Sequence, residues 1–358
     1  MADMMKAQVF YEPSRMELAE RPIPKISDTE VLVRVKVCGI CGSDIAYYYG
    51  AATLETPSGK GPLVLGHEFT GEVVEVGRVP GALGLFKPGD RVVLDPVQYC
   101  NACEICAKGQ VNLCETKTVL GVSVDGGFAE YAKSKYTGVK KLPDNVSYEQ
   151  GSLTEPLACA TYALQKLEVA PGDFCVVIGP GPIGLMMVQL AKSSGAGTVV
   201  LAGTRDYRLE VGKKLGADVL VNTKDKKSPH YVESLRDCIA ELTKGKMADR
   251  VVTPTGAVDA METALDISGR RSIIVFFGLP GPADRVRVPA LQSILWDKTI
   301  RFSWLAPFTW PQALSALSSG LVKTDELISH RFSLRDLPSA LGKVRDREDR
   351  VMKAVVMV

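Results

Sequence analysis

Hydrophobic and polar positions follow two different periodic patterns in the two parts of the chain. In residues 1 to about 150, apolar and polar side chains alternate in short stretches such as EVLVRVKVCGI, FTGEVVEVG and GDRVVLDP, with Gly and Pro between them. A period of two residues is typical of half-buried strands, so this region is predicted to be rich in β-strands and turns.

From about residue 170, strands and helices take turns. FCVVIGP has the pattern of a short apolar strand, and PIGLMMVQLAKSSGA repeats its apolar side chains at helical spacing. The alternation continues through VVLAG, DYRLEVGKKLGAD, ADRVVTPTG, AVDAMETALDIS and RRSIIVFFGLP. This order predicts βαβ units and a parallel sheet. We interpret RRSIIVFFG as an edge strand that pairs with a second subunit, so a homodimer or homotetramer is expected.

Length and composition narrow the classes of protein. A chain of 358 residues is too long for one compact core, so two domains are expected. The net charge of +2 leaves no field that would attract nucleic acid or an anionic membrane. The N-terminus lacks the apolar core of a signal peptide, and no apolar run reaches the length of a membrane span. With an odd number of cysteines, nine, the chain is expected in a reducing cytoplasm.

Four cysteines lie close together in CNACEICAKGQVNLC: Cys100, Cys103, Cys106 and Cys114. Cysteines at this density can form a disulfide framework, a redox couple or a metal site, or can simply be unrelated buried thiols. We favour metal, because four thiolates in one loop can close a tetrahedron around Zn²⁺. A closed site of this kind stabilises a loop and has no vacant position for chemistry.

A second set of candidate ligands is spread along the chain. CGICGSD contains Cys41 and Asp44, LGHEFTGEV contains His67 and Glu68, and SLTEPLAC contains Glu155. Taken singly, these side chains are ordinary: a buried thiol, a core imidazole and surface acids. Together they provide the ligand types of a catalytic zinc that keeps one position open, with Asp44 as a partner that orients a ligand.

A glycine-rich turn follows the strand FCVVI and opens a helix. Its residues are Gly179, Gly181, Pro182, Ile183 and Gly184. In this context G-x-G-x-x-G is typical of dinucleotide binding, because the glycines let the backbone approach a pyrophosphate at the helix N-terminus.

CGICGSD, GHEFTGEV, the four-cysteine loop, TEPLAC, GPGPIG and the RL…GAD stretch occur in this order across nearly the whole chain. In this respect the sequence resembles the zinc-dependent medium-chain dehydrogenases, and most of all their sorbitol/polyol dehydrogenase-like branch. The resemblance implies an α/β protein with a doubly wound Rossmann sheet at 154–290 and a β-rich GroES-like catalytic domain at 1–153 and 291–358.

The resemblance also implies roles for individual residues. Cys41 and His67 would bind a catalytic zinc, and Glu68 and Glu155 would complete its sphere directly or through water. Ser43 would pass the substrate proton outward, and Tyr47 would line the substrate pocket. Cofactor contacts would come from the glycine-rich turn and from Gly203, Thr204, Arg205, Arg208, Gly278, Leu279 and Lys353, the last at the pyrophosphate.

The position expected to hold an acid for the adenosine ribose is Gly203 in the family register. Such an acid would repel a 2′-phosphate, whereas glycine makes room for it and Arg205 and Arg208 can clamp its oxygens. The alternative is that Asp206 reaches back to the ribose. We favour NADP(H) over NAD(H).

Two departures from the polyol pattern bear on the substrate. Ala46 stands where many relatives have a histidine, which leaves the proton relay beyond Ser43 open. Leu305 and Ala306 replace an Arg-Tyr pair of polyol relatives, and nearby Trp304 and Phe308 favour a more apolar pocket, unless these aromatics are ordinary core.

The sequence thus predicts two zinc ions per chain and hydride transfer between NADP(H) and a small secondary alcohol, polyol or sugar-derived alcohol, with the ketone or aldehyde in reverse. The alternatives are an NAD-dependent sorbitol/L-iditol-type dehydrogenase and a nucleotide-binding protein that has lost catalysis.

Overall fold

The chain forms two compact units in the computed structural model, which describes residues 3–358. Unit 1 comprises Met1–Pro156, Ala313–Ser318 and Thr324–Val358, and unit 2 comprises Leu157–Gln312 and Ser319–Lys323. The sequence assigned 291–312 to the catalytic domain. The structure groups these residues with unit 2, because the strand at Thr299–Phe302 joins the sheet of that unit.

Unit 1 is built mainly from antiparallel strands, as its alternating sequence predicts. A three-stranded sheet has the order β2-β1-β4, a seven-stranded sheet has the order β10-β6-β5-β3-β18-β17 with β9 also paired to β3, and β7 pairs with β8. The strands are β1 (Met4–Glu12), β2 (Arg15–Pro22), β3 (Glu30–Gly39), β4 (Leu63–Val64), β5 (Glu68–Val76), β6 (Arg91–Leu94), β7 (Val97–Gln98), β8 (Thr118–Val119), β9 (Tyr131–Lys135), β10 (Val139–Lys141), β17 (Ile328–Ser333) and β18 (Lys353–Met357).

The helices of unit 1 are mostly short and connect these strands. They are α1 (Gly42–Tyr48), α2 (Arg78–Ala82), α3 (Glu104–Ala107), α4 (Tyr148–Ser152) and α12 (Leu337–Asp346). Two further helices, α5 (Thr154–Leu167) and α11 (Trp310–Ser318), contain residues of both units.

Strand β3 gathers distant parts of the sequence at one end of the seven-stranded sheet. It pairs antiparallel with β5 and with β18, so that Gly39 lies opposite Glu68 on one side and opposite Val355 on the other. The end of β3, the start of β5 and the start of β18 therefore lie together.

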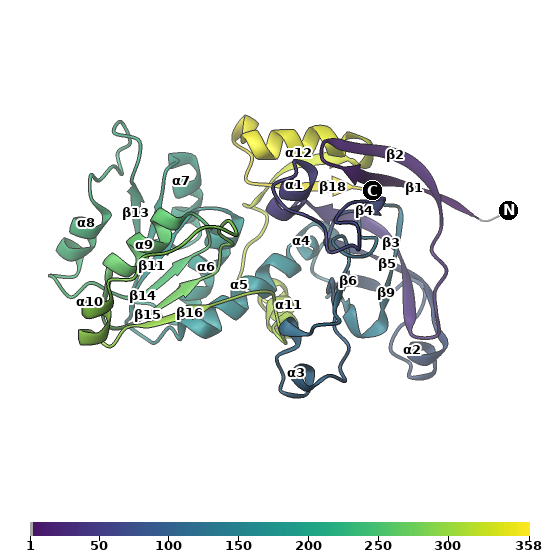
Figure 1. Cartoon of the computed structure of the whole chain (residues 1–358), viewed down its shortest axis with the longest axis horizontal. Coiled ribbons are helices and arrows are strands. Elements are labelled where there is room, and N and C mark those ends of the chain that lie inside the picture. Colours follow the sequence, from purple (N-terminus) through teal and green to yellow (C-terminus); the bar gives the residue numbers. More distant parts are fainter. Residues whose placement is uncertain (1–2) are drawn as a thin grey trace. The chain divides into compact units, whose positions relative to one another are not determined.

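Unit 2 contains a six-stranded sheet in which every pair of neighbours is parallel. Its order, β13-β12-β11-β14-β15-β16, is typical of doubly wound dinucleotide-binding sheets, and Figure 1 shows it between helices. The strands are β11 (Phe174–Ile178), β12 (Thr198–Gly203), β13 (Val219–Asn222), β14 (Ala248–Thr253), β15 (Ser268–Phe276) and β16 (Thr299–Phe302), and the helices are α6 (Pro182–Ser193), α7 (Asp206–Lys214), α8 (Leu235–Leu242), α9 (Val258–Asp266) and α10 (Ala290–Leu295). The predicted fold class is confirmed.

The edge of this sheet differs from the prediction. The strand in RRSIIVFFG, β15, pairs with β14 on one side and β16 on the other, so its interpretation as an edge strand was wrong. The edge strand on this side of the sheet is β16, and β13 is the edge strand on the other side. The sequence of β16, TIRF, is short and only partly buried and therefore carries little strand signal. Within residues 3–358, no helix is both long enough and apolar enough to cross a membrane.

Candidate metal and cofactor sites

The predicted ligands Cys41, His67 and Glu68 converge at the end of β3. Cys41 precedes α1, and His67 and Glu68 lie at the start of β5. One potential ligand atom from each residue lies within 4.8 Å of the others, and His67 and Glu68 are buried. A sulfur, an imidazole nitrogen and a carboxylate in this arrangement fit a zinc ion. Glu155 is buried as well, but it lies outside this trio.

Asp44 lies next to two residues of the trio, Cys41 and His67. One carboxylate oxygen accepts a hydrogen bond of 2.8 Å from the Cys41 backbone N–H, and the other lies 3.5 Å from His67 Nδ1. Burial alone would lower the pKa of His67, but the charges of Asp44 and Cys41 outweigh it and raise that pKa well above its ordinary value. Asp44 therefore faces Nδ1 at ion-pair distance, while Nε2 faces Ser43. Metal-binding histidines commonly have a carboxylate on the side of the ring that does not bind the metal.

Ser43 and Tyr47 lie one turn apart on α1, so both can face the same side of the helix. Ser43 Oγ is 3.5 Å from His67 Nε2. Tyr47 is partly buried, and burial is the main reason why its pKa is raised. The charge of His67 lowers this pKa, whereas the charges of Glu55, Asp44 and Cys41 raise it further. The structure therefore brings the predicted proton relay residue and the predicted pocket tyrosine to the metal trio.

Lys353 also reaches this trio, in a way that sequence reasoning missed. Its ammonium forms a buried ion pair with Glu68 and donates a hydrogen bond of 2.9 Å to the Ile40 carbonyl. The predicted contact of Lys353 with a pyrophosphate stays a prediction.

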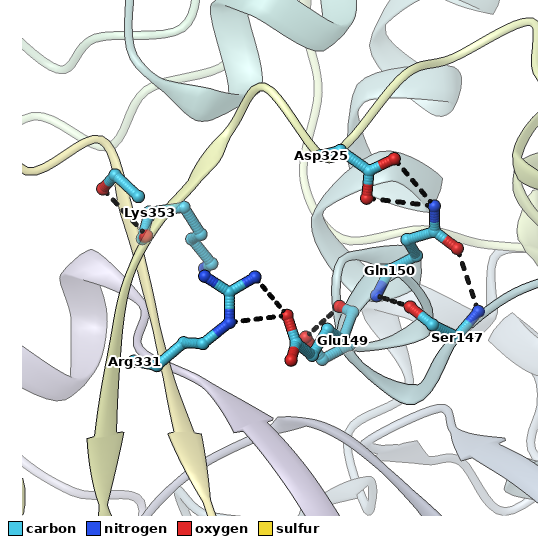
Figure 2. Close-up of polar contacts among 8 residues, drawn as sticks. Ser147, Glu149, Gln150, Asp325, Arg331 and Lys353 are labelled. Atoms are coloured by element: carbon cyan, nitrogen blue, oxygen red, sulfur yellow. Dashed lines mark hydrogen bonds and ion pairs between the residues drawn. The ribbon is translucent and has the colours of Figure 1, made fainter.

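Two polar networks hold the segment that leads to Glu155. Figure 2 shows Ser147 capping α4, Gln150 bonding to Asp325, and Glu149 receiving two bonds from Arg331 of β17. These contacts tie α4 to the far end of the sequence, and α5 with Glu155 follows directly.

Asp95 is a second buried group that the sequence did not reveal. Burial raises its pKa from 3.8 to about 7, against the bond that it accepts from Val97 and the charge of Lys140, while the charge of Glu155 raises it further. No motif marks this aspartate; only its burial between β6 and β7 shows that its charge is costly.

The four-cysteine loop has the geometry of a closed metal site. Sulfur atoms of Cys100, Cys103, Cys106 and Cys114 all lie within 4.8 Å of one another. Backbone N–H groups of Ala102 and Cys103 donate to Cys100 Sγ and lower its pKa to about 5, whereas burial and the neighbouring sulfurs raise the pKa of Cys106 to about 12. Four anionic sulfurs repel one another, and a divalent cation removes this conflict.

In unit 2, the glycine-rich turn lies between β11 and α6, as predicted. Gly179 has a φ of +131°, which favours glycine, and a side chain at Gly184 would collide with the Gly179 carbonyl. A side chain at Gly181 would meet nothing within 4 Å, so the turn leaves open space at the N-terminus of α6. This is where a pyrophosphate binds in such folds.

The structure gives a different reason for Gly203. A Cβ atom there would collide with the Pro180 ring, so glycine accommodates Pro180 rather than providing empty space for a phosphate. Asp206 accepts hydrogen bonds of 2.7 Å from Asn222 and from Ser228, and these bonds lower its pKa. Both bonds end on Oδ1, beside β13, and the alternative that Asp206 reaches back to a ribose stays a prediction.

The remaining predicted cofactor residues lie in the loops at the same sheet edge. Thr204 and Arg205 follow β12, and Arg208 lies in the first turn of α7 with its Nε 2.9 Å from the Tyr207 hydroxyl. Gly278 packs directly on the backbone of Thr255, and Leu279 is 74% exposed. Parallel strands end at one edge of a sheet, so these loops and the glycine-rich turn form one side of unit 2.

The aromatic side chains predicted near the substrate are not core residues. Trp304 is 37% exposed and Phe308 is 59% exposed, and Leu305 and Phe308 both have positive φ angles in the segment after β16. The interpretation of these aromatics as ordinary core is therefore wrong.

Comparison with known proteins agrees with this geometry. A family profile described as "Alcohol dehydrogenase GroES-like domain" matches residues 27–144, and one described as "Zinc-binding dehydrogenase" matches residues 182–319. D-arabitol-phosphate dehydrogenase of Enterococcus avium is 35% identical over 93% of this chain and 91% of its own length. Sorbitol dehydrogenase of Bacillus subtilis is 31% identical over 98% of this chain and 97% of its own length.

Solved structures show the same fold. A protein from Sinorhizobium meliloti, described as a zinc-binding dehydrogenase and bound to NADP, superposes with a TM-score of 0.91 at 27% identity, covering 99% of this chain and 100% of that one. Another neighbour, from Escherichia coli, is complexed with NADH. The neighbours therefore carry either nicotinamide cofactor.

Proposed function

This chain belongs to the zinc-dependent medium-chain alcohol and polyol dehydrogenases and is an oxidoreductase, and from this premise we propose that it transfers a hydride between NADP(H) and a secondary hydroxyl of a polyol or sugar-derived alcohol. The observation that carries the proposal is the convergence of Cys41, His67 and Glu68, with the Ser43 hydroxyl 3.5 Å from the imidazole of His67. The alternative of a protein without catalysis would need a damaged ligand set.

The residues in and around the trio have different parts in the proposed reaction. A zinc ion held by Cys41 and His67 would supply Lewis acidity, which lowers the pKa of a bound alcohol. Asp44 keeps the imidazole oriented through Nδ1, and Ser43 takes the substrate proton outward. Glu68 and Glu155 would complete the ligand sphere of that ion directly or through water. The residue after Ser43 in the relay is not a histidine, because Ala46 stands at that place.

A second zinc ion is proposed at the four cysteines. This ion would close the loop between β7 and β8 and leave no vacant position. The two sites together give two zinc ions per chain with separate roles.

NADP(H) is proposed as the preferred cofactor. The position at the end of β12 lacks an acid, Arg205 and Arg208 lie at the start of α7, and Asp206 is held by Asn222 and Ser228. Two guanidinium groups suit a 2′-phosphate, because each one offers a planar pair of N–H donors to the phosphate oxygens.

A homodimer through unit 2 is proposed for the assembly. β16 is one of the two edge strands of the sheet in unit 2, and an edge strand can pair with a second copy. α10 and β16 carry exposed apolar side chains that a second copy could cover: Leu291, Ile294, Leu295 and Phe302 are each between 67% and 75% exposed. The compartment is proposed to be the cytoplasm, which fits nine free thiols.

A substrate screen tests the proposed function. Purified enzyme would be assayed with a panel of polyols, sugar alcohols, their phosphates and simple secondary alcohols, each with NADP and with NAD, and with the matching ketones in reverse. We expect turnover of a secondary alcohol with NADP and little activity on sorbitol, because Leu305 and Ala306 replace the polar pair of polyol relatives. Exclusive oxidation of sorbitol with NAD would favour the alternative of a sorbitol-type enzyme.

A further inference from the structure

A cavity in unit 1 belongs to none of the sites described above. Its volume is about 470 Å³, which is within the range of cavities that hold small organic ligands. It contains no residue of the metal trio, of the glycine-rich turn or of the four-cysteine loop. We propose that this cavity binds a small amphipathic monocarboxylate, whose apolar body lies inside and whose carboxylate lies at Lys135.

The walls of the cavity come from segments that are far apart in the sequence. They include β9, the antiparallel pair of β7 and β8, and the segment 124–126. Apolar side chains from these and neighbouring segments line the space, and such a lining favours the apolar body of a ligand. Val124 is 37% exposed, and the other five are at most 5% exposed: Met5, Val64, Leu120, Ala129 and Ala132.

The charged groups of the lining leave one positive charge unpaired. Glu30 forms an ion pair with Lys133 at 3.1 Å. Asp125 forms an ion pair with Arg21 at 3.4 Å. Among residues 3–358, the ammonium of Lys135 has no ion-pair partner, and this residue forms hydrogen bonds only through its backbone. A ligand with one negative charge therefore matches this lining, whereas a cationic ligand does not.

The outer edge of β9 offers a backbone donor beside this ammonium. Lys135 donates its N–H to the Gln98 side chain at 3.0 Å, away from β3, the strand with which β9 pairs. N–H groups two residues apart in a strand point to the same side, so the Lys133 N–H also faces away from β3. In the part of the chain that the structure describes, no strand pairs with β9 on that side. A carboxylate can accept hydrogen bonds from this N–H and from the Lys135 ammonium together.

Calorimetric titration of the purified enzyme with octanoate tests the proposal. Acetate, which lacks the apolar body, and octylammonium, which has the opposite charge, are the comparison ligands. Lys135→Glu reverses the charge at the cavity, and Lys87→Glu is the matched control, because Lys87 is an exposed lysine of unit 1 outside the lining. Carboxylates also bind zinc, so His67→Ala is included to detect octanoate at the proposed metal.

We expect the wild type to bind one octanoate per chain and to bind acetate and octylammonium much more weakly. Lys135→Glu should weaken octanoate binding about tenfold, because an exposed charge contact becomes a repulsion of similar size. The same variant should bind octylammonium more tightly than the wild type does. Lys87→Glu and His67→Ala should keep the wild-type affinity for octanoate, whereas Val124→Trp, which fills the cavity from its exposed side, should abolish binding.

Four results would overturn the inference. The first is a wild type that does not bind octanoate, and the second is an equal affinity in the wild type and in Lys135→Glu. The third is a loss of binding in His67→Ala without a loss in Lys135→Glu, which would place the carboxylate at the metal. The fourth comes from light scattering: a smaller assembly of Val124→Trp, with no octanoate bound by the wild type, would assign the cavity to a contact between two copies of the chain.

Discussion

Cofactor preference can be tested by removing the two arginines at the start of α7. The double variant Arg205→Ala/Arg208→Ala takes away both guanidinium groups that the proposed 2′-phosphate site contains. Neither change touches the bonds from Asn222 and Ser228 to Asp206, so α7 keeps its N-terminal contacts. We expect a loss of efficiency with NADPH and little change with NADH.

The magnitude follows from the exposure of the two side chains. Hydrogen bonds to charged groups contribute about 1.5 to 3 kcal/mol when well shielded, but both arginines are only partly buried. A value of about 1 kcal/mol for each is therefore reasonable for pairs that water and salt weaken. Together they amount to about 2 kcal/mol, which corresponds to a change of about 30-fold in the preference for NADPH.

The assay is kcat/KM for NADPH and for NADH at low and at high ionic strength. The preference of the wild type should decrease as salt rises, because the contacts are exposed, and the double variant should show little salt dependence. Arg15→Ala, which makes the same change of charge per site in unit 1, should leave the preference unchanged. A wild type that prefers NADH, or a double variant with the wild-type ratio, would refute the reasoning.

Four other predictions concern the metal sites, the buried acid and the assembly. His67→Ala should abolish turnover and leave one zinc per folded chain, whereas Cys103→Ala should mainly lower the melting temperature; metal analysis and calorimetry distinguish the two. Glu155→Gln should lower turnover more than cofactor binding, and full activity with full zinc content would contradict its assigned role. Folding raises the pKa of Asp95 from 3.8 to about 7, so between these pH values the folded state binds a proton that the unfolded chain has released. The contribution of this group to stability therefore falls as pH rises from about 4 to about 7. Asp95→Asn should flatten the fall in melting temperature measured from pH 5 to 7. Ile294→Asp should convert a dimer to monomers in light scattering without loss of fold, since this side chain is 75% exposed.

The surroundings of Gly203 show why a single substitution at this position would be hard to interpret. Gly203→Asp looks like the direct way to restore an NAD-type acid, but the Pro180 ring lies where the new side chain would begin. Its effect would combine a steric change with the intended change of charge. Removing the arginines avoids this difficulty.

Local pattern was enough to predict much of this protein. The period of two in EVLVRVKVCGI, the alternation of strands and helices after residue 170 and the G-x-G-x-x-G turn between a strand and a helix depend on neighbours in sequence, and the doubly wound sheet is present as predicted. The four cysteines of one loop likewise lie close together in the structure because the loop is short. Contacts over a few residues are set by backbone geometry, which the sequence expresses directly.

Contacts between distant segments could be decided only by the tertiary structure. Glu68 and Lys353 are 285 residues apart and meet because β5 and β18 lie on either side of β3. The ring of Pro180 covers Gly203 because β11 and β12 are neighbours. β15 is not an edge strand because the four-residue strand β16 pairs with its outer side. The sequence determined which chemical groups are available and which elements carry them, whereas strand order and register determined which of those groups share a site, since pairing between remote strands leaves no local pattern in the chain.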